Sequence, residues 1–452
     1  MKKQIKEYRF SQLLFLTVVT ALGGLLFGYD ISVISGTVPY LQDYYDLTEA
    51  SKGFAVSSAY IGCIIGVLFA GKLSDNYGRK IILVVAGLLF IVSAIGSGWS
   101  QTLTGFIIYR VLGGVAVGTA SILAPMYISE ISPRQIRGKM VSINQLNIVI
   151  GIAVAYLINY FLVDLPDNWR WMFTAEAVPA FIFSFSMLFV PESPRWLVKK
   201  GKHSAAESVL SRIGTESYVQ REIAEIRESL NHIRTKAEDT VKSLFKPGLR
   251  KLLVIGIVLA VLQQWSGINV VFFYAPDIFK SIEVPMDAAL FQTTIIGLVN
   301  VVFTLVAMRL VDKVGRKVLL KYGALGMGLC YVFIGAFFYQ GMKDPVFLLI
   351  FFLLTAAFYS MSLAPLVWVV ISEIFPNRIR GLAMSAATVF LWIACYVLTL
   401  TFPILMEAIT GSFTFWIYAV ICFAGVIFVW KVVPETKGKS LEQLEKELIP
   451  SK

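Results

Sequence analysis

The sequence has few residues of the kinds that build catalytic and metal sites. Histidine occurs only 2 times in 452 residues, and both positions, His203 and His232, fall in one polar stretch. This excludes a histidine relay or a histidine metal site within an apolar segment. No nucleophile with a partner base, phosphate-binding loop or metal-ligand cluster stands out. The sequence therefore predicts no enzyme activity and no cofactor.

Cysteine and charge are scarce as well. Charged residues form 15% of the chain and apolar residues 57%, which excludes an ordinary soluble domain and indicates a protein that crosses a lipid bilayer several times. The 4 cysteines lie in apolar segments without paired spacing, so they are expected to be small buried residues that form neither disulfides nor metal sites. They are Cys63, Cys330, Cys395 and Cys422.

Apolar windows long enough to span about 30 Å of hydrocarbon as a helix recur along the chain. We predict twelve spanning helices and no cleavable signal peptide, because the first apolar run is too long for one and continues to Asp30. The predicted spans are 12–38, 53–71, 81–100, 103–126, 140–162, 171–190, 252–278, 288–309, 318–340, 345–371, 382–406 and 413–433.

The net charge of +11 could indicate a nucleic-acid partner, but the distribution of basic residues favours a topology signal. Lysine and arginine gather before the first span and after the second, fourth, eighth and tenth, whereas the loops on the other side are short and mostly acidic. Basic loops face the cytoplasm. We therefore expect a multi-pass protein of the cytoplasmic membrane with no nucleic-acid partner, whose termini and central polar stretch are cytoplasmic.

Three motif pairs recur roughly 240 residues apart, which indicates a duplication. Gly78-Arg79-Lys80 corresponds to Gly315-Arg316-Lys317, Ser129-Glu130 to Ser372-Glu373, and Pro191-Glu192 to Pro434-Glu435. The repeat predicts an all-α membrane protein with two pseudo-symmetric six-helix bundles. The expected units are an N-terminal bundle (1–196), a cytoplasmic helical insert (197–248), a C-terminal bundle (249–435) and a cytoplasmic tail (436–452).

The insert is predicted to be helical because apolar residues recur on one face of a charged segment, at Ile223, Ile226, Leu230 and Ile233. A disordered linker is the alternative. A second short helix is expected near 441–448 in the tail.

Charged residues at the cytoplasmic helix ends are expected to form networks that hold the two bundles together on that side when the site faces outward. Simple topology anchoring is the alternative, but the recurrence of these loops in register argues against it. The candidate residues are Asp75, Arg79, Glu130, Arg137, Glu192, Arg195, Asp312, Arg316, Glu373, Arg380 and Glu435.

The stretch from Gln263 to Pro276 is the main candidate for a binding site. It lies in an apolar run, yet Gln263, Gln264 and Asn269 carry amides, which are costly in lipid unless the protein or a ligand satisfies them. On one continuous helix these amides would line one broad face over two turns, and amides suit a ligand rich in hydroxyls because they both donate and accept. The alternative is that they join one helix to another.

Three ionisable residues, Asp30, Arg110 and Glu176, lie deep within predicted spans. Such groups usually pair or face a cavity. An adjacent arginine favours the ionised carboxylate, whereas separation or desolvation favours the protonated form, so a conformational change could load and unload a proton. The alternatives are a static buried ion pair and an Arg110 side chain that extends to the interface.

Together these motifs resemble the sugar-porter family of the major facilitator superfamily, including its bacterial xylose–proton and glucose–proton symporters and its animal glucose facilitators. The similarity also rests on Gly28-Tyr29-Asp30 and on the runs 191–197, 372–376 and 434–438. It implies two bundles that alternate around a central monosaccharide site. The residues that match sugar contacts of the family are Phe27, Gln145, Gln263, Gln264, Asn269, Asn300, Trp368 and Trp392.

The resemblance also implies roles for individual residues. Tyr274 matches a gate position, and Asp30, Arg110 and Glu176 match the coupling positions of the xylose symporters, whereas the animal facilitators have a neutral residue where Asp30 stands. The pocket departs from the xylose symporters at five positions, and its C-terminal half is expected to be more apolar, so a hexose and a pentose both remain open. These positions are Ile152, Phe273, Leu363, Leu391 and Cys395.

We therefore expect a monosaccharide–proton symporter that lies in the lipid bilayer and functions as a monomer. One alternative is a facilitator of the same fold, in which Asp30 and Arg110 are structural. Another is a sugar sensor, which the short C-terminal tail disfavours.

Overall fold

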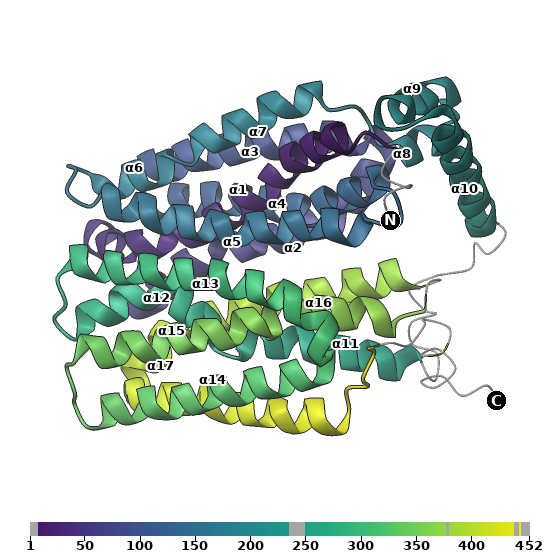
Figure 1. The fold of residues 1–452 in the computed structure, drawn as a ribbon. Helices are drawn as coiled ribbons and strands as arrows, with labels where there is room; N and C mark the ends of the chain where they lie inside the picture. The colour runs from purple at the N-terminus through teal and green to yellow at the C-terminus, as the bar shows by residue number, and fades with distance from the viewer. Residues whose placement is uncertain (1–7, 235–248, 377–378, 438–442, 444–452) are drawn as a thin grey trace.

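The computed structural model describes residues 8–234, 249–376, 379–437 and 443, and its helices form two bundles that lie side by side (Figure 1). The first bundle, called the N-half here, contains α1 to α7: Phe10–Tyr45, Glu49–Tyr77, Arg79–Trp99, Leu103–Ile131, Arg137–Phe161, Asn168–Thr174 and Ala177–Phe189. The second, the C-half, contains α11 to α17: Leu249–Trp265, Ile268–Ser281, Met286–Val314, Arg316–Tyr339, Pro345–Met361, Leu363–Ile374 and Arg380–Lys431.

The described residues contain 11 helical segments that are long and apolar enough to cross a membrane. The last of them, α17, has 52 residues, which at 1.5 Å per residue is about 78 Å, more than twice the hydrocarbon thickness. Its backbone leaves the helical region at Thr410, with φ 69° and ψ 162°, so α17 supplies two spans. This confirms the twelve predicted spans.

Local sequence explains where several helices begin. The hydroxyls of Thr48 and Thr102 accept hydrogen bonds from the first-turn amides of α2 and α4. Gly78 and Gly315, with φ of 102° and 107°, form the turns before α3 and α14. Because positive φ is costly for residues with a Cβ, glycine at both places allows the same tight turn in each half.

The apolar side chains left exposed form the surface that faces lipid. On α7, for example, Phe181, Phe185 and Phe189 recur every four residues on one exposed face, which fits a helix in contact with acyl chains. The four cysteines are buried free thiols.

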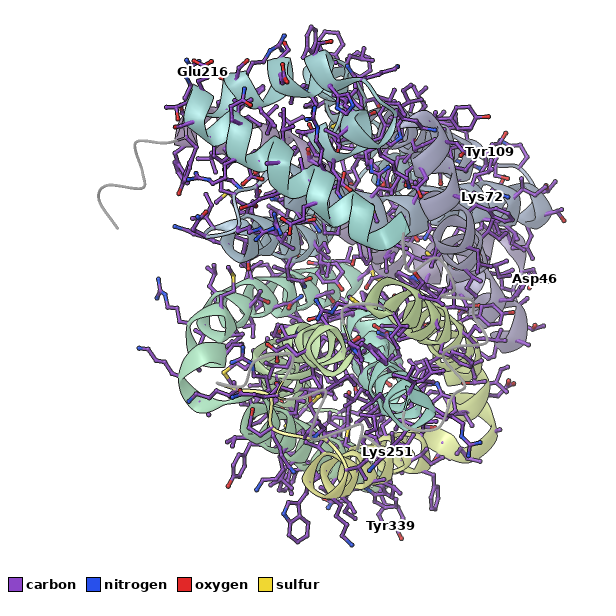
Figure 2. All side chains as sticks on the ribbon, turned by 90° about the vertical axis from the view of Figure 1, so that its right-hand side faces the viewer. Asp46, Lys72, Tyr109, Glu216, Lys251 and Tyr339 are labelled. Carbon is purple, nitrogen blue, oxygen red and sulfur yellow. The ribbon has the colours of Figure 1, made fainter. Side chains whose placement is uncertain are left out.

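The helices α8 (Pro194–Lys199), α9 (His203–Ile213) and α10 (Glu216–Arg234) lie at one end of the N-half (Figures 1 and 2). Arg134 pairs with Glu225 of α10 at 3.0 Å, and the Arg9 N–H donates to the Ile213 carbonyl. The helical prediction is confirmed up to Arg234, and the linker alternative is wrong there. Of the predicted stripe, Ile223 is buried and Ile226 partly buried, while the side chains of Leu230 and Ile233, and the tail helix near 441–448, lie outside the described residues.

Candidate functional site

The two halves are in contact at the end opposite the chain termini. Lys52 of α2 pairs with Asp277 of α12 at 3.1 Å and also with Glu49 of its own helix. The Tyr156 hydroxyl donates to the Phe272 carbonyl at 2.6 Å. These contacts close the interface between the halves at this end.

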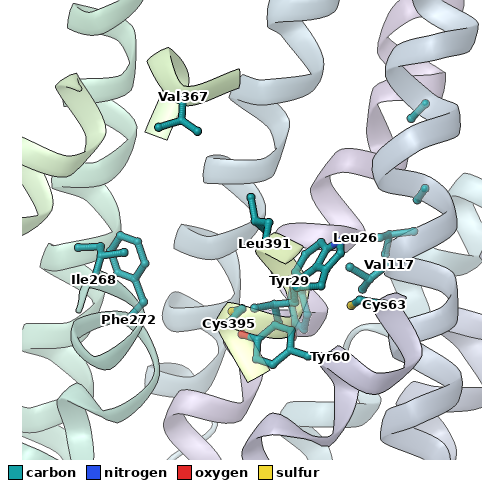
Figure 3. Packing of buried hydrophobic residues seen from close by; sticks show 14 of the residues in the cluster. Leu26, Tyr29, Tyr60, Cys63, Val117, Ile268, Phe272, Val367, Leu391 and Cys395 are labelled. Atoms are coloured by element: carbon teal, nitrogen blue, oxygen red, sulfur yellow. The ribbon is translucent and has the colours of Figure 1, made fainter. Parts of the chain in front are cut away.

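Aromatic rings from both halves meet further inside. Phe27 of α1 and Tyr60 of α2 each lie 5.8 Å, centroid to centroid, from the indole of Trp392 on α17, and Tyr60 also contacts Phe273 of α12. Figure 3 shows the Tyr60 hydroxyl pointing toward Cys395. The indole N–H of Trp392 is buried and has no hydrogen-bond partner within the described part of the chain, so it remains able to donate to a ligand.

The amides of the candidate stretch lie on two helices. The chain leaves the helical path at Gly267, with φ 84°, where α11 ends and α12 begins. The expectation of one continuous amide face is therefore wrong, because the left-handed glycine interrupts the helix. Even so, the Asn269 amide donates to Gln264 Oε1 at 2.6 Å and contacts the Cys395 sulfur at 3.1 Å.

Gln263 completes this chain of amides. Its Oε1 accepts a hydrogen bond from Gln264 at 3.3 Å, while its own amide donates to the carbonyls of Leu363 and Ala364, at the break between α15 and α16. The Gln263 amide thus joins helices, as the alternative interpretation expected, and the side chains of Gln263, Gln264 and Asn269 form a linked row of amides. Discontinuous helices of this kind are common in transporters, where they line binding sites.

The other predicted sugar contacts are placed as follows. Asn300 of α13 is buried, and its Oδ1 accepts a hydrogen bond from Ser360 at 2.7 Å. Gln145 of α5 and Trp368 of α16 are partly buried. The predicted gate residue Tyr274 is fully buried inside the C-half, where its hydroxyl donates to the Thr399 carbonyl at 2.8 Å. Its neighbour Phe273 instead reaches the N-half, where its ring contacts that of Tyr60.

The predicted buried charges come together. Arg110 Nη1 donates to Asp30 Oδ1 at 2.8 Å and Nη2 donates to the Asp30 carbonyl at 3.1 Å, with both side chains almost completely buried. Arg110 therefore does not extend to the interface. Glu176 lies between α6 and α7, is 1% exposed, and neither of its carboxylate oxygens, nor Asp30 Oδ2, is hydrogen-bonded to the described residues. Asp30 is thus paired with Arg110, whereas Glu176 is a second buried carboxylate without a hydrogen-bond partner in the described part of the chain.

The charged loops form one network in each half. In the N-half, both carboxylate oxygens of Glu130 accept from the Arg79 guanidinium at 3.1 Å, and Asp75 pairs with the same arginine. Glu192 accepts from the backbone N–H groups of Arg79 and Lys80. Burial, the largest influence, raises the pKa of the Glu192 carboxyl, although its hydrogen bonds to backbone amides oppose the shift.

The C-half repeats this arrangement. Arg316 pairs with Glu373 at 3.2 Å, and Glu435 accepts from the backbone N–H groups of Arg316 and Lys317. Arg137 and Arg380 donate to equivalent carbonyls, those of Ser132 and Phe375. Each network joins helices of one half in this conformation. Arg195 donates to Ser229 of α10, and the Asp312 side chain lies outside the described residues.

Several residues at the interface between the halves were not predicted from the sequence. Lys52 and Asp277 lie 225 positions apart and near the ends of spans, where charge is ordinary. Tyr60 and Tyr156 are aromatic residues in apolar helices, which gives no pairing signal. Gly53 is a further contact between the halves that the sequence does not reveal: an added Cβ would lie 2.3 Å from the Leu400 carbonyl oxygen, which only the folded structure shows.

Comparison with known proteins agrees with this architecture. Residues 16–448 match the family described as sugar (and other) transporters. The D-xylose-proton symporter of Escherichia coli strain K12 is 41% identical over 478 residues, with 97% of this chain and 96% of the symporter covered. The arabinose-proton symporter of Bacillus subtilis strain 168 is 41% identical over 448 residues, with 98% and 96% covered.

A solved structure of the E. coli xylose transporter in an inward open conformation superposes with a TM-score of 0.85 at 39% identity, and covers 96% of this chain and 99% of the transporter. The same transporter bound to 6-bromo-6-deoxy-D-glucose gives a TM-score of 0.82 at 40% identity, with 98% and 100% covered. The chain therefore belongs to the sugar transporter family and has the fold of the major facilitator superfamily.

Proposed function

We propose that the protein imports a monosaccharide, a hexose or a pentose, together with a proton by alternating access. The observation that carries the proposal is the buried Asp30–Arg110 pair, with Glu176 nearby and a carboxylate oxygen of Asp30 left without a partner in the described chain. Relatives 41% identical to this chain are named as proton symporters of D-xylose and of arabinose.

The sugar site combines amides with aromatic faces. Gln264 and Asn269 form a linked pair that can rearrange to bind adjacent hydroxyls, since each amide both donates and accepts. The rings of Phe27 and Trp392 can cover the apolar C–H face of the sugar. Gln145, Gln263, Asn300 and Trp368 complete the proposed set. Leu363, Leu391 and Cys395 are buried near these groups and make the site less polar.

The coupling step follows from the two protonation states of Asp30. The ionised Asp30 carboxylate pairs with Arg110, whereas the protonated carboxyl no longer compensates the arginine charge. Glu176 then becomes the alternative partner of Arg110. A change of partner deep in the N-half alters the packing of α1 against α4 and α6. Proton binding can thereby bias the equilibrium between conformations, provided that the two states bind the proton with different affinity.

The conformation described here is closed at the Lys52–Asp277 end. With both termini and the insert in the cytoplasm, as the basic loops indicate, this end is extracellular and the protein faces inward. The proposed units are a bundle at 1–196, an insert at 197–248, a bundle at 249–435 and a tail at 436–452, in a functional monomer. In the outward-facing state, we expect the charge networks of the two halves to approach each other at the cytoplasmic end.

The test is sugar-dependent proton uptake into proteoliposomes with glucose, galactose and xylose, for wild type and Asp30→Asn. Symport requires that sugar alkalinise the external medium for wild type, and that the variant retain only counterflow exchange. If sugar moves without protons in both proteins, the protein is a facilitator and the Asp30–Arg110 pair is structural.

A further inference from the structure

A row of buried serine hydroxyls runs from Asp30 toward the extracellular loop after α3. Ser93 and Ser97 lie four residues apart and therefore share one face of α3, and Ser100 follows directly after the helix ends at Trp99. They are 1%, 0% and 7% exposed, whereas the next residue, Gln101, is exposed. The row thus connects a fully buried carboxylate with the outer surface of the N-half.

The inner end of the row reaches the unpaired oxygen of Asp30. A Cβ built on Gly113 of α4 would lie 2.3 Å from Ser93 Oγ and 2.6 Å from Asp30 Oδ2, so these oxygens are less than about 5 Å apart. One water molecule can bridge such a separation, because two hydrogen bonds of about 2.8 Å each span about 5.5 Å. Only glycine at position 113 leaves the space between the two oxygens open.

The next step outward has similar dimensions. Ser93 and Ser97 are one helical turn apart, about 6 Å along the axis. Ser97 Oγ is completely buried and has no hydrogen-bond partner among the described residues. A buried hydroxyl of this kind is normally satisfied, often by ordered water. Asp30 Oδ2 is likewise buried without a hydrogen-bond partner among the described residues, so both Ser97 Oγ and Asp30 Oδ2 can bind a water molecule.

The outer end is controlled by a positive charge. Arg170 of α6 is buried and donates to the carbonyls of Gly98 and Ser100, with its guanidinium packed over the rings of Tyr44 and Trp169. A fixed positive charge opposes the passage of protons. In the inward-facing conformation, Arg170 therefore keeps Asp30 from being open to both sides of the membrane.

We propose that the external proton reaches Asp30 through the interior of the N-half, along Ser97 and Ser93 with intervening waters, and not through the sugar pathway between the halves. Each hydroxyl accepts one proton and passes on another, so the serines are unchanged at the end. An external hydronium ion gives up one proton and becomes water, and the ionised Asp30 carboxylate gains that proton. The ionisable groups that surround Asp30 are Arg110 of α4, Glu176 between α6 and α7, and Cys63 of α2. The proposal rests on the proton symport proposed above.

The experiment compares Ser97→Thr and Ser97→Val, which have nearly the same shape and differ in the hydroxyl, with Ser97→Ala as a smaller second variant. Proton-driven sugar uptake and sugar counterflow are measured in proteoliposomes. We expect uptake to fall at least about tenfold in the valine and alanine variants, as for the loss of a proton-transfer group, and to remain near wild type in the threonine variant. Counterflow, which needs no net proton movement, should stay within about twofold for all three.

Equal uptake in the valine and threonine variants would overturn the proposal, whether both match wild type or both lose uptake through altered packing. A loss of counterflow in parallel with uptake would do the same, because it would mark a structural role. If wild type itself moves no protons with sugar, the proposed function fails, which is a separate result from the behaviour of the Ser97 variants.

Discussion

The close approach of Gly53 to Leu400 sets how tightly α2 and α17 pack at the Lys52–Asp277 end of the two halves. A Cβ on Gly53 would lie 2.3 Å from the Leu400 carbonyl oxygen and 3.1 Å from its carbon, against 3.4 Å or more in ordinary contact. Both neighbours are backbone atoms, so no side-chain rotation relieves the overlap. In Gly53→Ala, the two helices must move apart by about 1 Å here.

The cost of this overlap falls on one conformation only. Overpacking of a tight contact typically costs about 1–3 kcal/mol. In the proposed transport cycle, the outward-open state separates these two helices and so avoids this cost. At 1.4 kcal/mol per tenfold, Gly53→Ala should shift the equilibrium toward the outward-open state by about 5- to 150-fold. Transport should slow because the closed state becomes less populated.

Native thiols can report this shift. Cys63 and Cys395 lie by the interface between the halves and are 0% and 3% exposed. Labelling by a membrane-impermeant maleimide added from outside should be faster in Gly53→Ala than in wild type. Gly71→Ala is the matched control on the same helix, because a Cβ there meets nothing within 4 Å. If the Gly53 and Gly71 variants label at the same rate, the proposed role of this contact is wrong.

Three further predictions concern the amides, the charge network and pH. Gln264→Ala removes the partner of Asn269 and should weaken sugar binding by about 5- to 150-fold in isothermal titration, as for the loss of about 1–3 kcal/mol; unchanged affinity in a folded variant would remove Gln264 from the site. Arg79→Lys loses the bidentate hydrogen bonds to the partly buried Glu130 and should lower thermal stability clearly more than Arg134→Lys, whose arginine is 63% exposed; equal effects would contradict this. Because the folded pKa of Glu192 is raised, its carboxyl contributes most stability below its ordinary value of 4.5, and this contribution is lost as pH rises through the folded pKa. The stability of wild type relative to Glu192→Gln should therefore decrease as the pH rises above about 4.5, and a constant difference in thermal unfolding would refute the shift.

Much of the fold was determined by the sequence alone, because membrane spans depend on local composition. Apolar windows predicted every span, including the two that α17 joins across Thr410, and the recurrence of Gly78 and Glu192 at Gly315 and Glu435 predicted the repeat that the two charge networks display. The depth of Asp30, Arg110 and Glu176 in apolar runs identified the buried charges, since ionisable groups in lipid are rarely unpaired.

Only the tertiary structure decided which groups meet. Asp30 and Arg110 are 80 positions apart, and Lys52 and Asp277 are 225 apart, so no spacing rule could pair them. The left-handed turn at Gly267 changed one expected helix face into two helices whose amides still touch. Contacts between helices depend on how whole rigid bundles pack, and this packing also selects the conformation in which the halves close at one end.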